Sequence, residues 1–360
     1  MKSILITGGA GFIGSNFVPY FLNKYPDYRI INLDKLTYAG SLDNLQELNS
    51  LVKPTDSPKV VRLANYVFIQ GDICNFELVS SIFEAYDIRG VIHFAAESHV
   101  DNSINNPRVF VETNVVGTFN LLQAAYKHWM GQPGQYKADY ENCRFHNVST
   151  DEVYGSLDIL PDVSSWTENS KYAPNSPYAA TKAAADFLAR SYYQTYGINI
   201  TTSNCSNNYG PKQHSEKLIP TIIRKCLAGE AIPIYGKGEN VRDWLYVLDH
   251  CKAIDLIFHK GRTGETYNVG GVNEKNNLEV VQIVCELLDN KLPRAAGKYS
   301  DLIIFVADRP GHDLHYAIDA TKLKTELGWQ AKESFETGMA KTLDWYLEAL
   351  HATPQLERVI

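Results

Sequence analysis

The sequence lacks several features that mark particular classes of protein. Its six cysteines form no C-x-x-C pair and no dense framework of the kind found in small secreted domains. No apolar stretch reaches the ~18 residues that a membrane-spanning helix needs. The chain opens directly into a strand-like run, with no charged leader and apolar core before it. We therefore expect reduced, buried thiols in a soluble cytoplasmic protein that crosses no membrane.

Charge of one sign is not concentrated anywhere in the chain. The formal net charge is -7, spread over 360 residues without a long acidic or basic run. This argues against nucleic acid or an anionic membrane as the main partner. The hydrophobic share of 44% is ordinary for a globular protein and leaves ample material for a core. An anionic substrate stays compatible with this balance if a few lysines and arginines converge.

Short apolar runs alternate with longer helical patterns in the first half of the chain. Strands are predicted at 3–6, 29–33, 66–70, 90–94, 144–149 and 199–203. Helical patterns lie between them, for example at 13–24, 77–86 and 113–129. This alternation predicts βαβ units and an α/β fold with a Rossmann-type doubly wound parallel sheet.

The pattern changes after about residue 205, where glycine and proline become frequent and helical patterns look shorter. We predict a smaller, mixed α/β substrate-binding domain there. The stretch 243–269 reads as a helix followed by a strand, which predicts a return to the first domain. The predicted division is 1–205 with 244–273 for the dinucleotide domain, and 206–243 with 274–360 for the other. The stretch 130–140 is polar and predicts a surface loop.

A glycine motif follows the first predicted strand and begins the first predicted helix. Gly8, Gly11 and Gly14 have the spacing G-x-x-G-x-x-G. Glycines let the backbone approach a pyrophosphate closely, and the helix N-terminus offers free N–H groups to the anion. The motif alone is a weak signal, but its place between strand and helix makes it a strong one for a dinucleotide.

Three further positions at strand ends fit the same cofactor. Asp34 ends the second strand, 20 residues past Gly14, where a carboxylate can accept bonds from ribose hydroxyls and repel the extra phosphate of NADP. This selects NAD. Asp72 and Ile73 follow the third strand and are placed to meet the adenine. The small residues Ala95 and Ala96 follow the fourth strand.

A tyrosine and a lysine with Y-x-x-x-K spacing predict the reactive centre. Tyr178 and Lys182 share a helix face because they are four residues apart. A nearby ammonium favours the phenolate of Tyr178, which can then take a proton from a sugar hydroxyl. A hydroxyl and two carboxylates, Thr150, Asp151 and Glu152, end the fifth strand. Alcohol oxidation needs only the tyrosine, so the added carboxylates suggest proton removal and loss of water.

At this point the sequence resembles the dTDP-glucose 4,6-dehydratases over nearly its whole length. The matching segments include the glycine loop, 33–40, 95–101, Thr113 with Asn114, Thr150 to Glu152, Tyr178 with Lys182, 207–211, 216–220, 233–235, 242–244 and 308–312. The Thr-Asp-Glu triplet is the most diagnostic, because related 4-epimerases usually have small or hydroxyl residues at the two acidic positions.

The resemblance implies NAD as cofactor and a homodimer formed through paired helices at 113–129 and 177–196. It also implies further cofactor contacts at Phe12, Ile13, Lys35, Leu36, Thr37, Ser98, Thr113 and Asn208. In the implied reaction, Tyr178, helped by Lys182 and Thr150, deprotonates the hydroxyl on hexose carbon 4. Glu152 removes the proton on carbon 5, and Asp151 protonates the hydroxyl that leaves carbon 6.

The second half supplies the substrate contacts that the resemblance implies. They are Ser98, His99, Thr150, Asn207, Glu216, Lys217, Leu218, Pro233, Ile234, Tyr235, Arg242, Asn277, Asp308, Arg309 and His312. Lys217, Arg242 and Arg309 are suited to the two phosphates of a sugar nucleotide, and Tyr235 to stacking on the base. His99 is equally compatible with a ligand site and with a structural role. No metal site is predicted.

Two alternatives remain open at this point. One is a 4,6-dehydratase acting on another nucleotide sugar, although Asp34 disfavours the NADP that a GDP-mannose enzyme would usually prefer. The other is a nucleotide-sugar 4-epimerase, against which Asp151 and Glu152 argue. A dinucleotide sensor without activity would commonly lack Tyr178 or Lys182, and both are present.

Overall fold

A central sheet of eight strands organises the first part of the fold. The computed structural model describes residues 2–49, 60–62, 64–157, 164–308 and 313–352. In spatial order the sheet reads β13-β9-β8-β5-β1-β2-β4-β3, and every neighbouring pair is parallel except β3 with β4. Its strands are β1 (Lys2–Thr7), β2 (Tyr28–Asp34), β3 (Val60–Arg62), β4 (Tyr66–Gln70), β5 (Ile88–His93), β8 (Arg144–Thr150), β9 (Ile200–Cys205) and β13 (Thr266–Val269). All six predicted strands are present, and the predicted return of the chain through 243–269 ends in β13.

The strand order reverses direction at β1, which pairs with β2 on one side and with β5 on the other. Beyond β2 the chain continues outward to β4, whereas from β5 it continues the opposite way to β8 and β9. In an open parallel sheet this reversal leaves a crevice at the carboxyl ends of the strands. The predicted doubly wound α/β fold is therefore confirmed.

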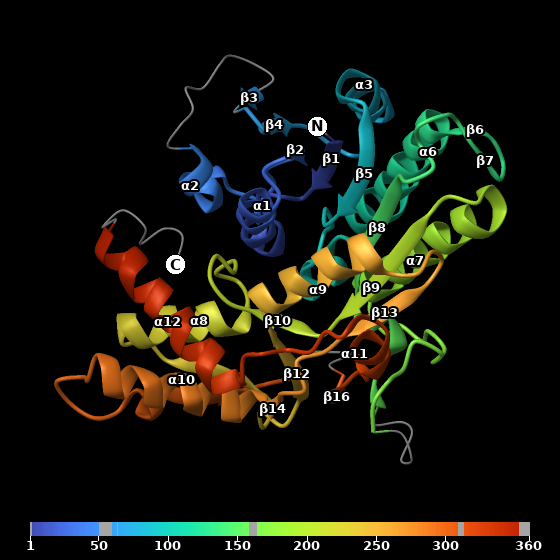
Figure 1. The fold of residues 1–360 in the computed structure, drawn as a ribbon. Coiled ribbons are helices and arrows are strands. Elements are labelled where there is room, and N and C mark those ends of the chain that lie inside the picture. Colours follow the sequence, from blue (N-terminus) through green and yellow to red (C-terminus); the bar gives the residue numbers. More distant parts are fainter. Residues whose placement is uncertain (1, 50–59, 63, 158–163, 309–312, 353–360) are drawn as a thin grey trace.

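Helices cover both faces of this sheet (Figure 1). One face carries α1 (Phe12–Lys24) and α9 (Val247–Lys260), and the other carries α3 (Phe76–Tyr86), α6 (Thr118–Trp129) and α7 (Pro177–Tyr196). Side chains of a strand alternate between faces. On β1, Leu5 accordingly packs with the second group of helices, whereas Ile4 and Ile6 pack with the first.

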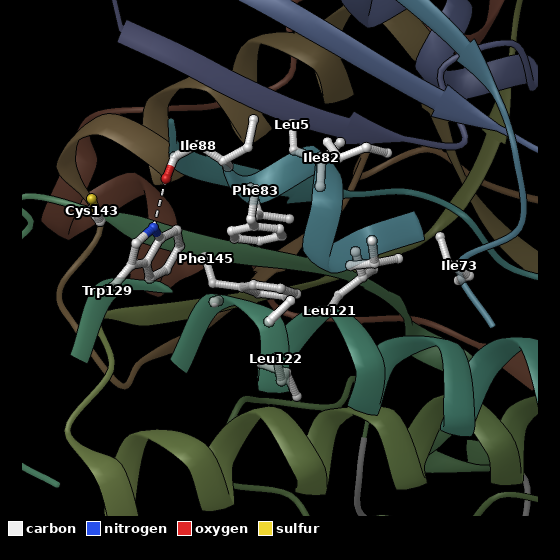
Figure 2. Packing of buried hydrophobic residues seen from close by; sticks show 14 of the residues in the cluster. Leu5, Ile73, Ile82, Phe83, Ile88, Leu121, Leu122, Trp129, Cys143 and Phe145 are labelled. Atoms are coloured by element: carbon white, nitrogen blue, oxygen red, sulfur yellow. Dashed lines mark hydrogen bonds between the residues drawn. The ribbon is translucent and has the colours of Figure 1, made fainter. Parts of the chain in front are cut away.

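The cluster between the sheet and α3, α6 and α7 is the largest of the buried groups. Figure 2 shows Phe83 and Phe145 between α6 and the strands, with Leu121 beside them. Trp129 is fully buried at the end of α6, and its indole N–H donates to the carbonyl of Ile88 at 2.7 Å. Burial of these aromatic side chains fixes the helix layer against the sheet.

Shorter elements lie around the carboxyl edge of the sheet and at the ends of the helices. They are η1 (Leu42–Leu45), α2 (Gln46–Asn49), α4 (Val100–Asn105), α5 (Pro107–Phe110), a π-helical segment η2 (Val111–Gly117) and η3 (Asp151–Tyr154). The helix predicted at 113–129 is thus present, but its first part is π-helical rather than α-helical.

A second group of elements lies outside the eight-stranded sheet, and most of its members pack around a separate core. Its strands are β10 (Asn207–Tyr209), β11 (Ile232–Tyr235), β12 (Val241–Tyr246), β14 (Glu274–Asn276), β15 (Ile303–Val306) and β16 (His315–Tyr316), and its helices are α8 (Leu218–Ala228), α10 (Asn277–Lys291), η5 (Tyr299–Leu302), α11 (Thr321–Leu327) and α12 (Phe335–Ala352). β12 pairs with β10, β14 and β16, and β11 pairs with β15. We propose that these elements form the second domain, with the boundaries predicted above. One boundary, between 243 and 244, falls within β12, and Leu323 of α11 packs against β13 and α9.

Two expectations about local structure were wrong. The helices after residue 205 are not short, since α10 has 15 residues and α12 has 18. Their apolar sides pack into a shared core with α8, which supports their length despite the glycines and prolines between them. The stretch 130–140 contains a hairpin of β6 (Met130–Gln132) and β7 (Gln135–Tyr136) rather than only loop, with Gly134 at positive φ in its turn and Met130 buried.

The six cysteines are free thiols, and all except Cys74 are buried. The sulfur atoms of Cys226 and Cys285 lie 4.0 Å apart without a bond between them. Within the described parts of the chain, no helix has the length and apolar character needed to cross a bilayer.

The buried aromatic cluster makes a prediction about stability. Phe83→Ala should lower the free energy of unfolding by about 3–5 kcal/mol, because it leaves a cavity between α3 and the sheet. Urea unfolding followed by fluorescence measures this loss. Leu292→Ala, at a side chain that is 47% exposed, is the control and should change stability by under ~1 kcal/mol. Equal losses in the two variants would contradict the packing described here.

Candidate active site

A pocket of about 300 Å³ runs along the carboxyl ends of β1, β2, β4, β5 and β8. It brings together most of the residues predicted to bind cofactor or to react. Those that line it are Gly8, Gly11, Phe12, Ile13, Gly14, Asp34, Lys35, Thr37, Asp72, Ile73, Ala95, Ala96, Ser98, Thr113, Thr150, Asp151, Glu152, Tyr178, Lys182, Asn207, Asn208, Glu216 and Lys217. Residues separated by up to about two hundred positions thus meet in one crevice.

The three motif glycines face different constraints. Gly8 has φ +73°, and a Cβ there would lie 2.6 Å from the backbone nitrogen of Ala95. At Gly14 a Cβ would lie 2.3 Å from the carbonyl oxygen of Gly8, so this glycine permits close packing of α1 on the loop. A Cβ at Gly11 would meet nothing closer than 3.4 Å. Gly11 lines the pocket, so its missing side chain leaves room for a ligand rather than for the protein.

Asp34 organises the loop that surrounds the pocket. Its carboxylate accepts hydrogen bonds from the backbone N–H groups of Ala10 at 2.9 Å and Leu36 at 2.8 Å. Leu36 has positive φ and does not line the pocket, so its role here is through its backbone. Burial raises the pKa of Asp34, and the two backbone bonds oppose that shift. A carboxylate fixed in this way is placed to receive hydroxyl groups of a ribose.

An ion pair joins two loops across the far end of the pocket. The ammonium of Lys35, just after β2, lies 2.7 Å from the carboxylate of Asp72, just after β4. Both side chains line the pocket and are partly exposed. An elongated dinucleotide fits a pocket with these three features: the motif glycines, the fixed carboxylate of Asp34 and the Lys35–Asp72 ion pair.

The π-helical segment η2 supports the pocket from behind. Asn114, within it, is buried and accepts from the backbone N–H of Glu97 at 2.8 Å. Its amide group also donates to the carbonyl of Glu97 at 3.0 Å and to the hydroxyl of Thr181 at 3.0 Å. Thr113, the preceding residue, lines the pocket. The loop after β5 is thereby tied to α7.

The predicted reactive groups converge where β8 meets α7. Thr150 ends β8, and its hydroxyl accepts from the backbone N–H of Glu152 at 3.3 Å, which caps η3. Tyr178 is the second residue of α7, whose N-cap is Ser176. The ammonium of Lys182 donates to the carbonyl of Val148 at 2.8 Å, one strand position before Ser149.

Asp151 lies in surroundings that favour its protonated form. It is only 1% exposed, and burial raises its pKa well above the usual range for a carboxyl group. The negative charges of Glu152 and Asp243 add to this shift, whereas Arg242 opposes it. Its Oδ2 atom has no hydrogen-bond partner among the described residues. A protonated carboxyl with an unsatisfied oxygen at a pocket wall can donate a proton to a ligand.

Burial dominates the electrostatics of Tyr178. It raises the pKa of the phenol well above its usual value, with Glu152 acting in the same direction and a hydrogen bond from Thr150 acting against it. Burial also lowers the pKa of Lys182, while Asp186 opposes that decrease. Stabilisation of the Tyr178 phenolate by Lys182 would therefore have to overcome a strong opposing effect of burial. This role of Lys182 stays a prediction.

On the substrate side of the pocket, Lys217 and Ser98 are in contact. The Lys217 ammonium donates to the Ser98 carbonyl at 3.1 Å. The side-chain oxygen of Asn208 accepts from Nδ1 of His250 at 2.9 Å, and the backbone carbonyl of Asn208 accepts from Gln213. His99 caps α4 by accepting from the backbone N–H of Asn102, and it lies 4.0 Å from Glu216. A structural role of His99 is thus present beside any role in binding.

The remaining described substrate candidates form a second group outside this pocket. Tyr235 ends β11 with Pro233 and Ile234 before it, and a Cβ on the next residue, Gly236, would lie 3.0 Å from the carboxylate of Asp308. Asn277 begins α10 and donates its backbone N–H to the carbonyl of Asn240. Leu218 begins α8 and packs on the second core instead of lining the pocket.

Arg242 connects this second group to the reactive carboxylates. Its guanidinium donates to the carbonyls of Asp313 and Leu314 at 2.8 and 3.3 Å and lies over the ring of Tyr316. Its charge also lowers the pKa of Asp151, as noted above. Arg309 and His312 fall outside the described residues.

Comparison with known proteins identifies the family. A family model described as GDP-mannose 4,6 dehydratase matches residues 5–342. The chain belongs to this family. Within it, the dTDP-glucose 4,6-dehydratase of Xanthomonas campestris pv. campestris (strain B100) is 50% identical over 348 residues, which are 96% of this chain and 93% of that one. An Escherichia coli protein of the same name is 49% identical over 350 residues, which are 96% and 92%.

Solved structures of dehydratases share the fold over its full length. The dTDP-glucose 4,6-dehydratase from Bacillus anthracis str. Ames, in complex with NAD, has a TM-score of 0.82 and 44% identity, covering 99% of this chain and all of that one. The enzyme from Streptomyces venezuelae with NAD and TYD bound has a TM-score of 0.84 at 42% identity and the same coverage. A UDP-glucose 4-epimerase from Thermotoga maritima also matches, at 0.81 and 27%. The resemblance seen in the sequence is therefore confirmed.

The dehydratase pocket also contains residues that sequence reasoning did not select. Glu97, Ser149, Cys205, Ser206, Gln213 and His214 line it. Glu97 stood within a matching segment, next to the predicted Ala96 and Ser98, so its place could have been found. Cys205 and Ser206 follow the predicted strand at 199–203, and only the observed extension of β9 to Cys205 brings them to the pocket edge.

Gly11 allows a specific test of cofactor binding in this dehydratase fold. Gly11→Ala should leave the fold intact, because the added Cβ meets no protein atom closely, but it should weaken NAD binding by about tenfold or more. The NAD content of the purified variant and its affinity in titrations measure this. Gly131→Ala is the matched control, since a Cβ there has its nearest neighbour at 3.8 Å and lies in the β6–β7 hairpin. Unchanged NAD affinity in Gly11→Ala would contradict the proposed path of the pyrophosphate.

Proposed function

We propose that this protein is an NAD-dependent dTDP-glucose 4,6-dehydratase that forms dTDP-4-keto-6-deoxyglucose and water. The observation that carries the proposal is the meeting of Asp151 and Glu152 with Tyr178 in one dinucleotide pocket. Oxidation and reduction alone would not require two carboxylates there. The identity of about half of all positions with dTDP-glucose 4,6-dehydratases supports the same reaction.

The first step is assigned to Tyr178, Thr150 and Lys182. Tyr178 takes the proton of the hydroxyl on carbon 4, while Thr150, whose hydroxyl bonds to Tyr178, orients the two oxygens. Lys182 holds the end of β8 through Val148. Its positive charge is assigned to stabilising the Tyr178 phenolate that accepts this proton. When bound, NAD accepts the hydride from carbon 4 and later returns it to carbon 6.

The second step is assigned to the two carboxyl groups. A ketone at carbon 4 acidifies the proton on carbon 5, and Glu152 removes that proton. Asp151 donates a proton to the hydroxyl on carbon 6, which leaves as water. The raised pKa of Asp151 supports this role, because the group must hold a proton at neutral pH. Glu152 then returns its proton to carbon 5. The proton that Tyr178 took from the carbon-4 hydroxyl replaces the one that Asp151 gave to the departing water, so one water is lost and no net oxidation occurs.

The nucleotide is assigned to Lys217 and Asn207 at the pocket and to the second group of residues outside it. Lys217 and Arg242 are proposed to meet the phosphates, together with Asn207 on β10, the strand that pairs with β12, which carries Arg242. Tyr235, with Pro233 and Ile234, is proposed to hold the base, with Asn277 and Asp308 nearby. The contributions of Arg309 and His312 and the cytoplasmic location stay predictions.

The proposal is tested by incubating the purified protein with dTDP-glucose and no added cofactor. A 4-keto-6-deoxy product, identified by its alkaline absorbance and the loss of one water in mass, is expected. If none forms, NAD is added, and then UDP-, CDP- and GDP-sugars are supplied in turn. If only one of these sugars is dehydrated, that sugar and not dTDP-glucose is the substrate. Isomerisation without a change of mass would indicate an epimerase.

The two carboxyl roles predict a block at one step. Glu152→Gln should lower the overall rate by about 100-fold or more because the carbon-5 proton has no acceptor. Oxidation at carbon 4 should continue, so reduced nicotinamide should accumulate and be visible by absorbance after substrate is mixed in. Full dehydration by Glu152→Gln would show that another group is the base.

The raised pKa of Asp151 predicts a dependence on pH. A carboxyl group donates a proton only below its pKa, so elimination should slow as the pH rises through this raised value. The fraction of reduced nicotinamide in the steady state should therefore increase towards alkaline pH. Asp151→Asn is the control and should accumulate reduced cofactor without this dependence. A fraction that falls with rising pH would contradict the role of Asp151.

We also propose that the protein forms a homodimer through α4, η2, α6 and α7. Exposed apolar side chains lie on these adjoining elements: Ile104, Val111, Val116, Phe119 and Phe187. Covering such side chains against a second copy would remove them from water. The resemblance implies pairing through 113–129 and 177–196, and α4 adds Ile104 beside them.

The dimer is tested by the mass of the protein in solution. Phe119→Glu should shift it towards the monomer, because a carboxylate would be buried in the interface. Phe305→Glu, at another exposed phenylalanine, on β15, is the control and should leave the mass unchanged. A wild-type monomer, or a Phe119→Glu dimer, would contradict this interface.

A further inference from the structure

Asp186 is a buried carboxylate behind the reactive groups. It lies one helical turn after Lys182 on α7 and is 6% exposed. It does not line the active-site pocket but faces a separate cavity of about 540 Å³ on the other side, together with Tyr172 and Arg190. Its role must therefore differ from contact with cofactor or substrate.

Three donors converge on this carboxylate. The side-chain amide of Asn147 donates to Oδ1 at 2.7 Å, and the hydroxyl of Ser149 donates to Oδ2 at 2.8 Å. The phenol of Tyr172 donates to the same Oδ2 at 3.1 Å. A carboxylate is the side chain suited to accept three bonds on two oxygens without donating any.

Two of these donors belong to the strand that carries the reactive hydroxyl. Asn147 and Ser149 are two residues apart on β8, so their side chains lie on one face of the sheet. Between them, the backbone carbonyl of Val148 accepts from Lys182. Helix α7 thus contacts three consecutive residues of β8, directly before Thr150.

The third donor extends the contact to the turn that carries the two carboxyl groups. The Tyr172 hydroxyl accepts from the amide of Asn204 at 3.0 Å, and that amide also donates to the hydroxyl of Tyr154 at 3.0 Å. Tyr154 in turn donates to Asn268 at 2.9 Å. Because Tyr154 ends η3, both sides of the Thr150–Glu152 segment are connected to Asp186.

We propose that Asp186 is a positioning residue that holds the end of β8 and the turn η3 in register with α7. Through this clamp, defined as Asp186 with Asn147, Ser149 and Tyr172, the groups on β8 and η3 meet Tyr178 and Lys182. The inference rests on the proposed function. A displacement of about 1 Å between such groups can cost roughly 100-fold in rate.

A second buried carboxylate provides a matched control. Asp255 on α9 is 2% exposed by side chain and lies 2.5 Å from the ammonium of Lys24, with Tyr20 also donating to it. It joins α1 to α9, and its hydrogen bonds and ion pairs are to Tyr20, Lys24 and His259 rather than to β8 or η3. The Asp255→Ala variant therefore shows how much activity is lost when a buried carboxylate is removed and only the stability of the protein is affected.

The first experiment compares Asp186→Ala with Asp255→Ala. Asp186→Ala should lower kcat for dTDP-glucose by about 30- to 100-fold, with KM and NAD content changed by less than about threefold. Asp255→Ala should lose a similar amount of thermal stability and keep kcat within about threefold. Equal effects of the two variants on kcat would overturn the proposal.

A reciprocal exchange tests the hydrogen bonds directly. In Asp186→Asn with Asn147→Asp, the new amide on α7 donates to the new carboxylate on β8, and its oxygen still accepts from Ser149 and Tyr172. All three bonds of the clamp are retained, so kcat should return to within about tenfold of the wild type. A double variant as slow as Asp186→Ala would mean that the clamp is not what positions the site.

Should Asp186→Ala fail to fold, Asn147→Ala removes one bond and leaves the carboxylate with two donors. It should lower kcat by about tenfold at constant KM, and an unchanged kcat would overturn the proposal. Hydrogen exchange gives a readout that needs no turnover: amides of 147–152 should exchange faster in Asn147→Ala. A wild-type protein that does not turn over dTDP-glucose, with this change in exchange present, would reject the proposed function and retain the clamp.

Discussion

The pairing of β1 between β2 and β5 is the constraint on which the rest of the structure depends. All three strands are parallel, so their carboxyl ends share one edge, and the chain leaves that edge in opposite directions on either side of β1. Every group assigned to the cofactor or to the chemistry follows one of the strands at this edge or stands on a helix beside it. The crevice exists because the strand order reverses there, before any side chain is specified.

Burial of charge gives the site its chemical character. Asp34, Asp151, Lys182, Asp186 and Arg242 are all nearly inaccessible to water. A buried charge is costly unless it is paired or bonded, and the structure satisfies most of these groups with backbone donors or carbonyls. Asp151 is the exception, since one of its oxygens has no partner in the described structure. The unsatisfied group is the one whose assigned task is to give a proton to the substrate.

Much of the fold and of the cofactor site could be predicted from sequence, because those features depend on local patterns. Gly8, Gly11 and Gly14 stand directly between a strand and a helix, and Asp34 ends the next strand. Asp186 carries no such local sign, since its donors come from β8 and from the loop before α7, and only the tertiary structure brings them together. The second core likewise depends on packing among distant helices, so the lengths of α10 and α12 were underestimated.

The π-helical segment η2 has a consequence for the helix that follows it. Each added residue turns an α-helix by about 100°, and a π-helical turn holds more residues than a regular one. One continuous rod has to turn Asn114 toward the loop at Glu97 and also turn Leu121 and Trp129 toward the sheet. The π segment changes the angle around the helix axis between Asn114 and the pair Leu121 and Trp129, so that each can face its own partners. Deleting a single residue from 111–117 would keep the helix continuous but rotate one set of side chains away from its partners. The number of residues in this segment is therefore restricted as well as their identity.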